Sequence, residues 1–322
     1  MESRYDYEMM VRVAQMYYID GFKQEKIAKQ VGLSRSSVCM ILAEARENGI
    51  VEIKVKNPEN NNAELSNELI NKFNLSKCFV IPTSITAINT LTQVVATQGA
   101  SLAEREMKSH SVIGVAWGST MYEFMQAFTN QKNLADIQVV PLIGGTNRMD
   151  SEFQLNEMVR ILAEKLNGKP VYIYAPAYTE SEEDKELYMK SVSMQTVQDK
   201  WSALDVAVVS VGAIPEYYQN YDSKVLFDPF VVKTIFEKDP ERAVGDICGR
   251  WFNIMGKFLT NDHNKKLIAI DEDKLAAAPK VICIASGTHK VLSLVGALRS
   301  ETIDILITDE NTAKSVLEVS NI

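Results

Sequence analysis

The stretch Gln24–Ala43, QEKIAKQVGLSRSSVCMILA, decides the fold of the N-terminal part of the chain. Its apolar residues have the spacing of two short helices that bury their inner faces against each other: Ile27, Val31, Leu33, Val38 and Ile41. Gly32 stands at the turn between them, where a positive φ costs a residue without a Cβ atom little. Ala28 is small where the helices approach closely, and Ser34 is placed to cap the second helix. The stretch therefore predicts a helix-turn-helix.

The second helix starts with short polar side chains and one cation, which are suited to contact phosphates and base edges in a DNA groove. We expect the following residues to form the DNA-contacting surface: Lys23, Gln24, Ser34, Arg35, Ser36, Ser37 and Met40. The alternative is an ordinary αα-hairpin with a glycine in its turn. Such a hairpin requires neither the small Ala28 nor a polar helix start.

The two flanks of this stretch favour the DNA-binding interpretation. Tyr7–Ile19 has apolar residues at helical spacing, which predicts a supporting first helix. Gly49 is placed to end the last helix, and Ile50–Lys56 alternates apolar and polar side chains, as a strand of a small wing does. We therefore predict that residues 1–56 form a winged helix-turn-helix that binds DNA.

The charge of the chain is divided unequally. The whole sequence has a formal net charge of −8, whereas residues 1–56 hold nine Lys/Arg and eight Asp/Glu, a net charge of +1. From Lys23 to Arg35 there are four basic residues against Glu25 alone. A local positive surface is what DNA binding requires, because bound cations release the counterions of the phosphates. Since +1 is modest for one module, we expect several copies to bind together.

The composition is that of a globular protein long enough for two domains, with 322 residues, 46% hydrophobic and 24% charged. No apolar run approaches the roughly 20 residues that span a membrane, and the polar N-terminus is unlike a signal peptide. The four cysteines and three histidines are scattered, which predicts neither disulfides nor a metal site. We therefore expect a cytoplasmic protein without a cofactor.

A polar linker at residues 57–62, where Pro58 prevents a helix, leads into a chain that alternates apolar runs with helical segments. Apolar runs occur in the following stretches: 77–81, 111–128, 138–147, 170–178, 205–215, 267–270, 281–298 and 304–317. Continuous apolar strands between helices predict a mainly parallel sheet covered on both faces, in an α/β domain of Rossmann-like type. Residues 63–322 would form this second domain, and such sheets bind ligands beyond the carboxyl ends of their strands.

Several turns that follow apolar runs are suited to bind an anion, because backbone N–H groups, small side chains and a helix start meet there. The best is Ser286–Lys290, in which Gly287 allows close approach, Thr288 offers a hydroxyl group and Lys290 adds a positive charge. An ordinary loop with a surface lysine is the alternative. Two weaker candidates are Gly118–Ser119–Thr120 and Gly144–Gly145–Thr146.

A fourth candidate is Gly245–Arg250, in which Arg250 would clamp a phosphate and Asp246 would accept hydrogen bonds from sugar hydroxyl groups. A local Asp–Arg pair in a glycine-rich turn explains the same residues. Catalytic pairs are less persuasive: Glu180–Glu186 is typical of a solvated helix start, and Asp309 is placed to cap the last helix.

The order of these pieces resembles the SorC/DeoR-type family of bacterial sugar-responsive transcriptional regulators over nearly the whole chain. The resemblance rests on KQEKIAKQVGLSRSSV, GIVEIKV, VIGVAWGSTMYE, VVPLIGG, NEMVRILAEKL, VGDICGRWF, SGTHKVLSLVGALR and ILITDENTA. Each segment is weak alone, but together in this order they are highly specific. The resemblance implies a second domain similar in fold to phosphosugar isomerases but without catalysis, a phosphorylated sugar effector, and a dimer or tetramer on operator DNA.

The resemblance also implies which residues line the effector pocket: Gly118, Ser119, Thr120, Gly144, Gly145, Thr146, Arg250, Gly287, Thr288 and Lys290, with Asn156 and Asp246 for sugar hydroxyl groups. Two positions depart from the family pattern. Some relatives have a lysine before the Gly-Gly turn that forms a Schiff base with an aldehyde sugar; here Ile143 has no amine, so covalent capture is not expected. Many relatives have Ser-Arg where this chain has Cys39–Met40, which weakens one phosphate contact or changes the operator sequence that is read.

We therefore interpret the chain as a regulator, of the repressor type, of a sugar-utilisation operon that is controlled by a phosphosugar. The rival from another class is a phosphosugar isomerase with an accessory DNA-binding domain, and turnover of a phosphosugar would favour it. A third alternative is an activator, or a regulator that answers to an unphosphorylated sugar.

Overall fold

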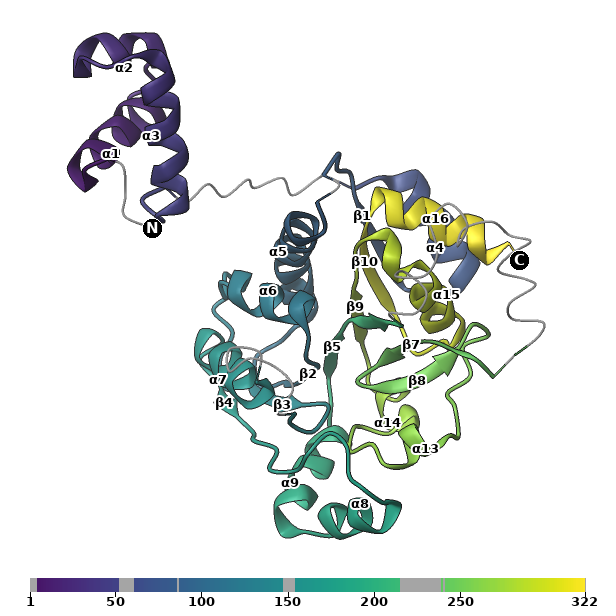
Figure 1. Cartoon of the computed structure of the whole chain (residues 1–322). Helices are drawn as coiled ribbons and strands as arrows, with labels where there is room; N and C mark the ends of the chain where they lie inside the picture. The colour runs from purple at the N-terminus through teal and green to yellow at the C-terminus, as the bar shows by residue number, and fades with distance from the viewer. Residues whose placement is uncertain are drawn as a thin grey trace. The chain divides into compact units, whose positions relative to one another are not determined.

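The computed structural model describes residues 5–51, 61–85, 87–146, 154–214, 239 and 241–321. The chain divides into two compact units, residues 1–59 and 60–322, each with its own hydrophobic core (Figure 1). Among the described residues, no helix is long and apolar enough to cross a membrane.

The first unit is helical over its described residues. Its elements are α1 (Tyr7–Ala14), the π-helical turn η1 (Gln15–Ile19), α2 (Gln24–Val31) and α3 (Arg35–Glu47). The predicted pair of helices is confirmed: Gly32 ends α2 with a φ of 69°, and the Ser34 hydroxyl accepts a hydrogen bond from the Ser37 N–H at 3.1 Å. The core of this unit joins all three α-helices: Met10, Val13, Ala14, Ile27, Ala28, Val38, Ile41, Leu42 and Ala45. Of the predicted wing strand, residues 52–56 lie outside the described residues, and Ile50 and Val51 are not part of a strand.

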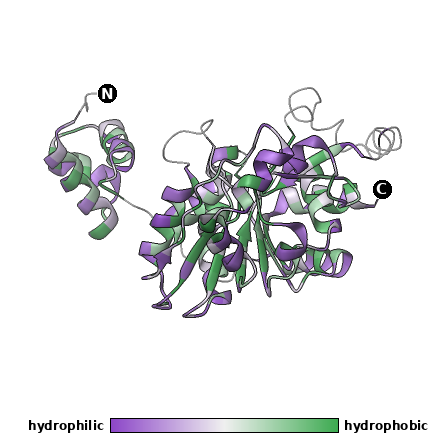
Figure 2. Ribbon diagram, turned by 90° about the horizontal axis from the view of Figure 1, so that it is seen from below, coloured by the Kyte–Doolittle hydropathy of each residue, from purple (hydrophilic) through white to green (hydrophobic). Residues whose placement is uncertain are grey.

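The second unit is built on a seven-stranded parallel sheet with the order β1-β10-β9-β5-β2-β3-β4. Its strands are β1 (Lys77–Ile81), β2 (Val112–Val115), β3 (Gln138–Pro141), β4 (Lys169–Pro170), β5 (Val206–Val209), β9 (Val281–Ile284) and β10 (Ile305–Asp309). The central strands are buried along their whole length. Figure 2 shows hydrophobic strands in the middle layer of this unit. The predicted mainly parallel α/β sheet is confirmed.

Helices cover both faces of this sheet, with α5, α6 and α7 along one face and α4, α15 and α16 along the other (Figure 1). The helices of the unit are α4 (Ala63–Phe73), α5 (Ile88–Glu106), α6 (Ser119–Ala127), α7 (Leu155–Lys165), α8 (Glu182–Met189), α9 (Val192–Trp201), α13 (Asp262–Lys265), α14 (Glu272–Ala276), the 3-10 turn η3 (Thr288–Lys290), α15 (Val291–Arg299) and α16 (Glu310–Ser320). Asp309 caps α16 as predicted, because its carboxylate accepts a hydrogen bond from the Thr312 N–H at 3.0 Å.

A small antiparallel sheet, β6-β7-β8, lies beside the main one; its strands are β6 (Val211–Ala213), β7 (Ala243–Ile247) and β8 (Arg250–Asn253). The apolar run at 205–215 therefore supplies two strands, because the chain leaves the main sheet at Ser210 and enters the small one. The expected strands at 170–178 and 267–270 were wrong beyond β4. Buried apolar residues of these two segments join the core through isolated bridges, such as Tyr178 with Leu267, instead of a continuous ladder.

The order of the strands reverses between β5 and β2. From β2 the chain adds β3 and β4 in one direction, and from β5 it adds β9 and β10 in the other. A parallel sheet leaves a crevice at such a reversal, just beyond the carboxyl ends of the two strands. A ligand site is therefore expected at the turns after β2 and β5.

Candidate functional site

A cavity of about 220 Å³ lies at this reversal; we call it the Lys290 cavity. It is lined by Ala116, Trp117, Gly118, Ser119, Thr120, Ser210, Val211, Gly212, Asp246, Cys248 and Lys290. These residues come from the turn after β2 and the start of α6, from Ser210 and β6, from the turn after β9, and from the β7–β8 hairpin. Segments that are distant in sequence thus meet around one small space.

Lys290 brings a cation into this cavity. Its Nζ atom donates hydrogen bonds to Thr120 Oγ1 and to Ser210 Oγ, both at 3.1 Å. Burial lowers the pKa of the Lys290 amine, and the nearby Cys283 and Asp246 side chains oppose that shift. Among the described residues its hydrogen-bond partners are neutral hydroxyl groups, so one N–H of the ammonium group is left for a ligand.

The N-terminus of α6 faces the same space. Gly118 precedes the helix with a φ of 113°, and a Cβ atom at this position would meet nothing within 4 Å. The first N–H groups of a helix have no partner within the helix and carry partial positive charge. Together with Lys290, this helix start concentrates positive charge at one end of the cavity, a property that favours anions at helix N-termini.

Asp246 supplies the acceptor in the cavity. Burial raises the pKa of its carboxyl group, and the hydrogen bond from the Gly249 N–H, 2.9 Å from Oδ2, and the charge of Lys290 oppose that shift. The carboxylate packs over Gly212 of β6, where an added Cβ atom would lie 2.0 Å from Asp246 Oδ1. Gly212 therefore lets the carboxylate turn into the cavity, where it can accept hydrogen bonds from hydroxyl groups.

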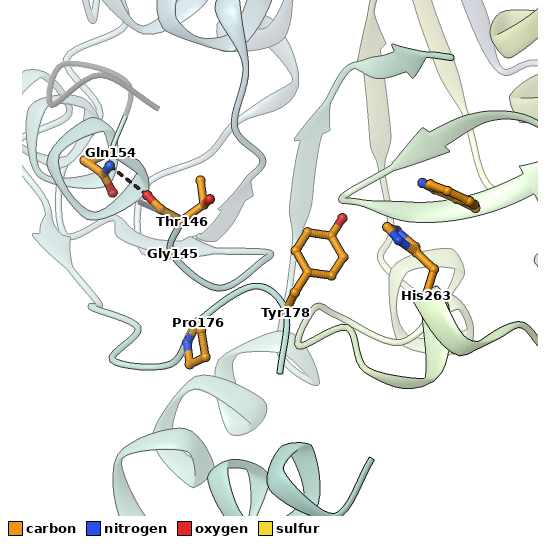
Figure 3. A pocket seen from close by; sticks show the side chains of 7 residues that line it. Gly145, Thr146, Gln154, Pro176, Tyr178 and His263 are labelled. Atoms are coloured by element: carbon orange, nitrogen blue, oxygen red, sulfur yellow. Dashed lines mark hydrogen bonds between the residues drawn. The ribbon is translucent and has the colours of Figure 1, made fainter. Parts of the chain in front are cut away.

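A second and larger cavity, about 980 Å³, is lined by Gly145, Thr146, Gln154, Pro176, Tyr178, Trp251 and His263; we call it the aromatic cavity. Figure 3 shows Gly145, Thr146 and Gln154 on one side and Tyr178 and His263 on the other. Gln154 Nε2 donates a hydrogen bond to the Thr146 carbonyl oxygen at 2.8 Å, which ties the start of α7 to the turn after β3.

Tyr178, Trp251 and His263 form an aromatic wall. The rings of Trp251 and His263 stack with centroids 3.9 Å apart and an interplanar angle of 20°, and the Tyr178 ring lies 4.7 Å from His263 at a tilt of 51°. Burial lowers the pKa of His263, opposed by its hydrogen bond with the Gly249 carbonyl oxygen at 3.0 Å. The imidazole is therefore neutral at neutral pH.

The β7–β8 hairpin joins the two cavities. Asp246 and Cys248 line the Lys290 cavity, whereas the carbonyl oxygen of Gly249 is held by His263 and by the Tyr178 hydroxyl group, the latter at 3.4 Å. Gly249 has a φ of 75°, and a Cβ atom there would lie 2.9 Å from the Tyr178 hydroxyl oxygen. A glycine at this position lets the tip of the hairpin approach the aromatic wall.

The structure brings seven of the predicted pocket residues to these cavities. Gly118, Ser119, Thr120, Asp246 and Lys290 line the Lys290 cavity, and Gly145 and Thr146 line the aromatic cavity. Residues from turns that lie far apart in the sequence thus line two neighbouring cavities.

Two predicted residues require correction. A Cβ atom on Gly144 would lie 2.3 Å from the Pro176 carbonyl oxygen, so this glycine serves backbone packing. Asn156 uses both ends of its amide on Ile173, donating to the carbonyl oxygen at 2.9 Å and accepting from the N–H at 3.0 Å. It fixes the chain after β4 and lines neither cavity.

The other three predicted residues also lie outside both cavities. Arg250 Nη2 donates to the Ile270 carbonyl oxygen at 3.1 Å and lies 3.8 Å from an Asp271 carboxylate oxygen. Gly287 donates its N–H to Asp309 and Thr312, and Thr288 is exposed. In the turn after β9, Lys290 alone reaches the cavity.

Sequence reasoning missed Ser210, Gly212, Tyr178, Trp251 and His263. Ser210 and Gly212 follow the buried run of β5, which is a usable signal for a ligand-binding turn. Trp251 directly follows Arg250, but nothing in the spacing links it to His263 or Tyr178. Only the folded chain stacks these rings.

The residues predicted to contact DNA lie mostly on the exposed side of α2 and α3. Lys23, Ser34, Arg35, Ser36 and Met40 are exposed, and Gln24 and Ser37 are partly buried. The Arg35 side chain is 69% exposed, and its Nη1 atom lies 3.7 Å from a Glu25 carboxylate oxygen. Because both side chains are exposed, this pair leaves the guanidinium group available.

The family model described as "Putative sugar-binding domain" matches residues 57–318, which is most of the chain. The sorbitol operon regulator of Klebsiella pneumoniae is 27% identical over 99% of this chain and 100% of its own length. The chain belongs to the SorC/DeoR-type family of transcriptional regulators. The deoxyribonucleoside regulator of Bacillus subtilis is 26% identical, with 96% of this chain and 97% of the relative covered.

Solved structures of the SorC/DeoR-type family share the fold. The crystal structure of the full-length sorbitol operon regulator SorC from Klebsiella pneumoniae superposes with a TM-score of 0.71 at 26% identity, covering 98% of this chain and 100% of that one. A DeoR family transcriptional regulator from Listeria monocytogenes gives a TM-score of 0.65 at 26% identity, covering 79% of this chain and 98% of that one. Both of the present units thus have counterparts in a full-length SorC-type structure.

Proposed function

We propose that this SorC/DeoR-type protein is a cytoplasmic transcriptional regulator, of the repressor type, of a carbohydrate-utilisation operon, and that a phosphorylated sugar controls it. The main support is the Lys290 cavity of about 220 Å³, at the point where the strand order reverses. Three groups line it: the Lys290 ammonium group, which has one N–H left for a ligand, the N-terminus of α6, and the Asp246 carboxylate, which can accept hydrogen bonds from hydroxyl groups. The ammonium group and the helix N-terminus are suited to bind a phosphate, and the carboxylate is suited to bind the hydroxyl groups of a polyol. Relatives named as regulators of sorbitol and deoxyribonucleoside use support the same ligand class.

The first unit would bind the operator as a winged helix-turn-helix, with α3 in the major groove. Its support is the glycine turn after α2, the cap on Ser34 and the exposed polar start of α3. Operators of such proteins repeat with the symmetry of the bound oligomer, so a dimer or tetramer would place several copies of α3 on successive half-sites.

Effector binding would act by shifting the population of two oligomer arrangements that hold the first units at different spacings. The phosphate bound at Lys290 and α6 favours one arrangement, and the operator favours the other. Two or three charge-assisted contacts at about 1.5–3 kcal/mol each are enough to move occupancy, because a shift of a few kcal/mol changes the populations severalfold to a hundredfold.

A phosphosugar isomerase with an accessory DNA-binding unit has one observation in its favour. Asp246 and Lys290 line one cavity, and burial shifts the pKa of each group toward the neutral form, as it does in acid-base catalysts. The family relationship favours regulation without turnover, since the relatives compared are named as regulators. Incubation with candidate phosphosugars, followed by product analysis, distinguishes the two functions.

The test of the regulator function is binding of the purified full chain to its own upstream DNA, titrated with phosphorylated sugars and with their unphosphorylated counterparts. Release of DNA by one phosphosugar, but not by its free sugar, is the expected result. Tight DNA binding that no compound changes would overturn the effector assignment. Tighter DNA binding with the effector would show an activator or co-repressor mode.

A further inference from the structure

The aromatic wall is held rigidly and without charge. His263 stacks on Trp251 with ring centroids 3.9 Å apart, and the Tyr178 ring lies 4.7 Å from His263 at a tilt of 51°. Both His263 and the Tyr178 hydroxyl group are tied to the carbonyl oxygen of Gly249, at 3.0 and 3.4 Å. The three rings line one cavity and support one another, and a rigid aromatic lining loses little entropy when a ligand packs on it.

Trp251 keeps its place in the fold without its side chain. The Asn264 side chain, which is buried, accepts a hydrogen bond from the Trp251 N–H at 2.8 Å and donates one to its carbonyl oxygen at 2.9 Å. The backbone of β8 is therefore fixed by Asn264 and by pairing with β7. The indole ring, which is only partly buried, stacks on His263 and lines the cavity.

The wall opposite is polar. Gly145 and Thr146 come from the turn after β3, and Gln154 stands before α7; these residues line the side of the cavity opposite Tyr178 and His263 (Figure 3). A cavity with one polar wall and one aromatic wall fits a molecule that has hydroxyl groups at its edge and C–H groups on a flat face.

A closed sugar ring is such a molecule, whereas an open-chain polyol is not. The ring fixes several C–H groups on one side, and these meet the negative face of an aromatic ring. In an open chain the C–C bonds rotate, so the C–H groups do not share a face and ordering them costs conformational entropy.

On the basis of the function proposed above, we propose that the face of the sugar ring packs against the aromatic wall. Trp251 and Tyr178 then make the protein bind cyclic sugar phosphates more tightly than open-chain ones. The sugar ring packs on the wall in the aromatic cavity, and its phosphate is bound in the neighbouring Lys290 cavity across the β7–β8 hairpin. Trp251 and Tyr178 are specificity residues, and His263 positions both.

The test compares two sets of probes by calorimetry on the full chain. One set is anhydrohexitol phosphates, whose six-membered ring cannot open, in gluco, manno and galacto configurations; the other is the open-chain hexitol phosphates of the same configurations. Neither set has a carbonyl group, and both carry one phosphate, so the ring is the main difference. We expect at least one ring compound to bind about tenfold more tightly than its open-chain partner, as stacking worth about 1 kcal/mol together with a smaller ordering cost predicts.

Variants assign the preference to the wall. Trp251→Phe keeps an aromatic face and is expected to keep the preference, whereas Trp251→Leu is expected to lose it, measured as the ratio of the affinities for the ring compound and its open-chain partner. Tyr178→Leu and Tyr178→Phe give the same comparison on the second ring, if Trp251→Leu does not fold. Equal affinity for ring and open-chain compounds, or a preference that survives both leucine variants, overturns the inference.

The two proposals fail differently. If hexitol phosphates release operator DNA as readily as the ring compounds do, the regulator function is supported, but the proposed ring specificity of the aromatic wall is wrong. If no compound of either set binds, the phosphosugar assignment fails, and the inference about the wall fails with it.

Discussion

The ammonium group of Lys290 lies 3.1 Å from the hydroxyl oxygen of Thr120, although 170 positions separate the two residues in the chain. Thr120 belongs to the first turn of α6 after β2, and Lys290 ends the turn after β9. Ser210, which follows β5, completes the triangle at 3.1 Å. The site thus depends on the parallel order of β9, β5 and β2, which brings the carboxyl ends of these strands to one edge.

Replacing Lys290 by methionine is expected to weaken binding of the effector about 10- to 150-fold, because a charge-assisted hydrogen bond is worth about 1.5–3 kcal/mol. Burial already disfavours the Lys290 cation in the free protein, so the variant is expected to be at least as stable as the parent. Calorimetric titration measures the first effect, and urea denaturation the second. Lys314→Met is the matched control, since this exposed lysine pairs with Glu310 within α16. Equal losses in the two variants would mean that Lys290 does not touch the ligand.

Replacing Gly249 by alanine is expected to lower the local stability around the β7–β8 hairpin by about 2–3 kcal/mol. The added Cβ would lie 2.7 Å from Ile143 Cδ1 and 2.9 Å from the Tyr178 hydroxyl oxygen, in addition to the strain of a φ of 75°. Gly21→Ala is the control for strain alone, because its φ is 69° and a Cβ atom meets nothing within 4 Å. Hydrogen exchange read separately for each segment measures both changes. A cost at Gly249 no greater than that at Gly21 would show that the hairpin tip has room to move.

The stability of the second unit is expected to fall as the pH drops below the ordinary histidine pKa of 6.5, in part through His263. Its pKa in the folded state is lowered by burial, so at these pH values the unfolded chain binds more protons than the folded one. The contribution is therefore complete above pH 6.5 and is lost as the pH falls toward the folded-state pKa.

His263→Phe isolates this contribution, because it keeps a ring between Trp251 and Tyr178 and removes the titrating group. Burial lowers the pKa of His289 in the same direction, and this residue remains in both proteins as a common background. Urea denaturation at a series of pH values should give a shallower pH dependence for the variant. Parallel curves for the two proteins would place the acid sensitivity elsewhere.

Much of the fold is predictable because local rules act on short stretches. The hydroxyl group of Ser34 caps α3, and Gly32 takes a positive φ, as the sequence pattern requires. The buried runs of β2, β5 and β9 are continuous because helices cover both faces of a parallel sheet. At 205–215 one apolar run supplies β5 and then β6, and the periodicity of the sequence does not reveal the change of sheet at Ser210.

The candidate site was only partly predictable, for a physical reason. Gly118 and Lys290 are recognisable because a turn after a buried strand needs glycine, and a cation there has few structural uses. The aromatic wall is not, because the stacking of Trp251 on His263 is a tertiary contact between β8 and α13 that leaves no spacing in the sequence. Asn156 was expected in the pocket from the family resemblance. In the structure its side-chain amide makes two hydrogen bonds with the backbone of Ile173 instead.

Replacing Arg35 by alanine is expected to weaken operator binding and to leave effector binding unchanged, because the residue lies in the first unit, exposed at the start of α3. If its guanidinium group contacts a phosphate, the slope of log affinity against log salt should fall by about one for each bound copy, since one counterion fewer is released per contact. Arg46→Ala is the matched control, because this arginine lies in the last turn of the same helix and donates to the Leu42 carbonyl oxygen at 3.4 Å. DNA binding by filter or anisotropy assay at several salt concentrations gives both slopes. An equal loss of operator affinity in both variants would mean that Arg35 contributes only through the general charge of the surface. A loss of effector affinity in Arg35→Ala would contradict the assignment of DNA binding and effector binding to separate units.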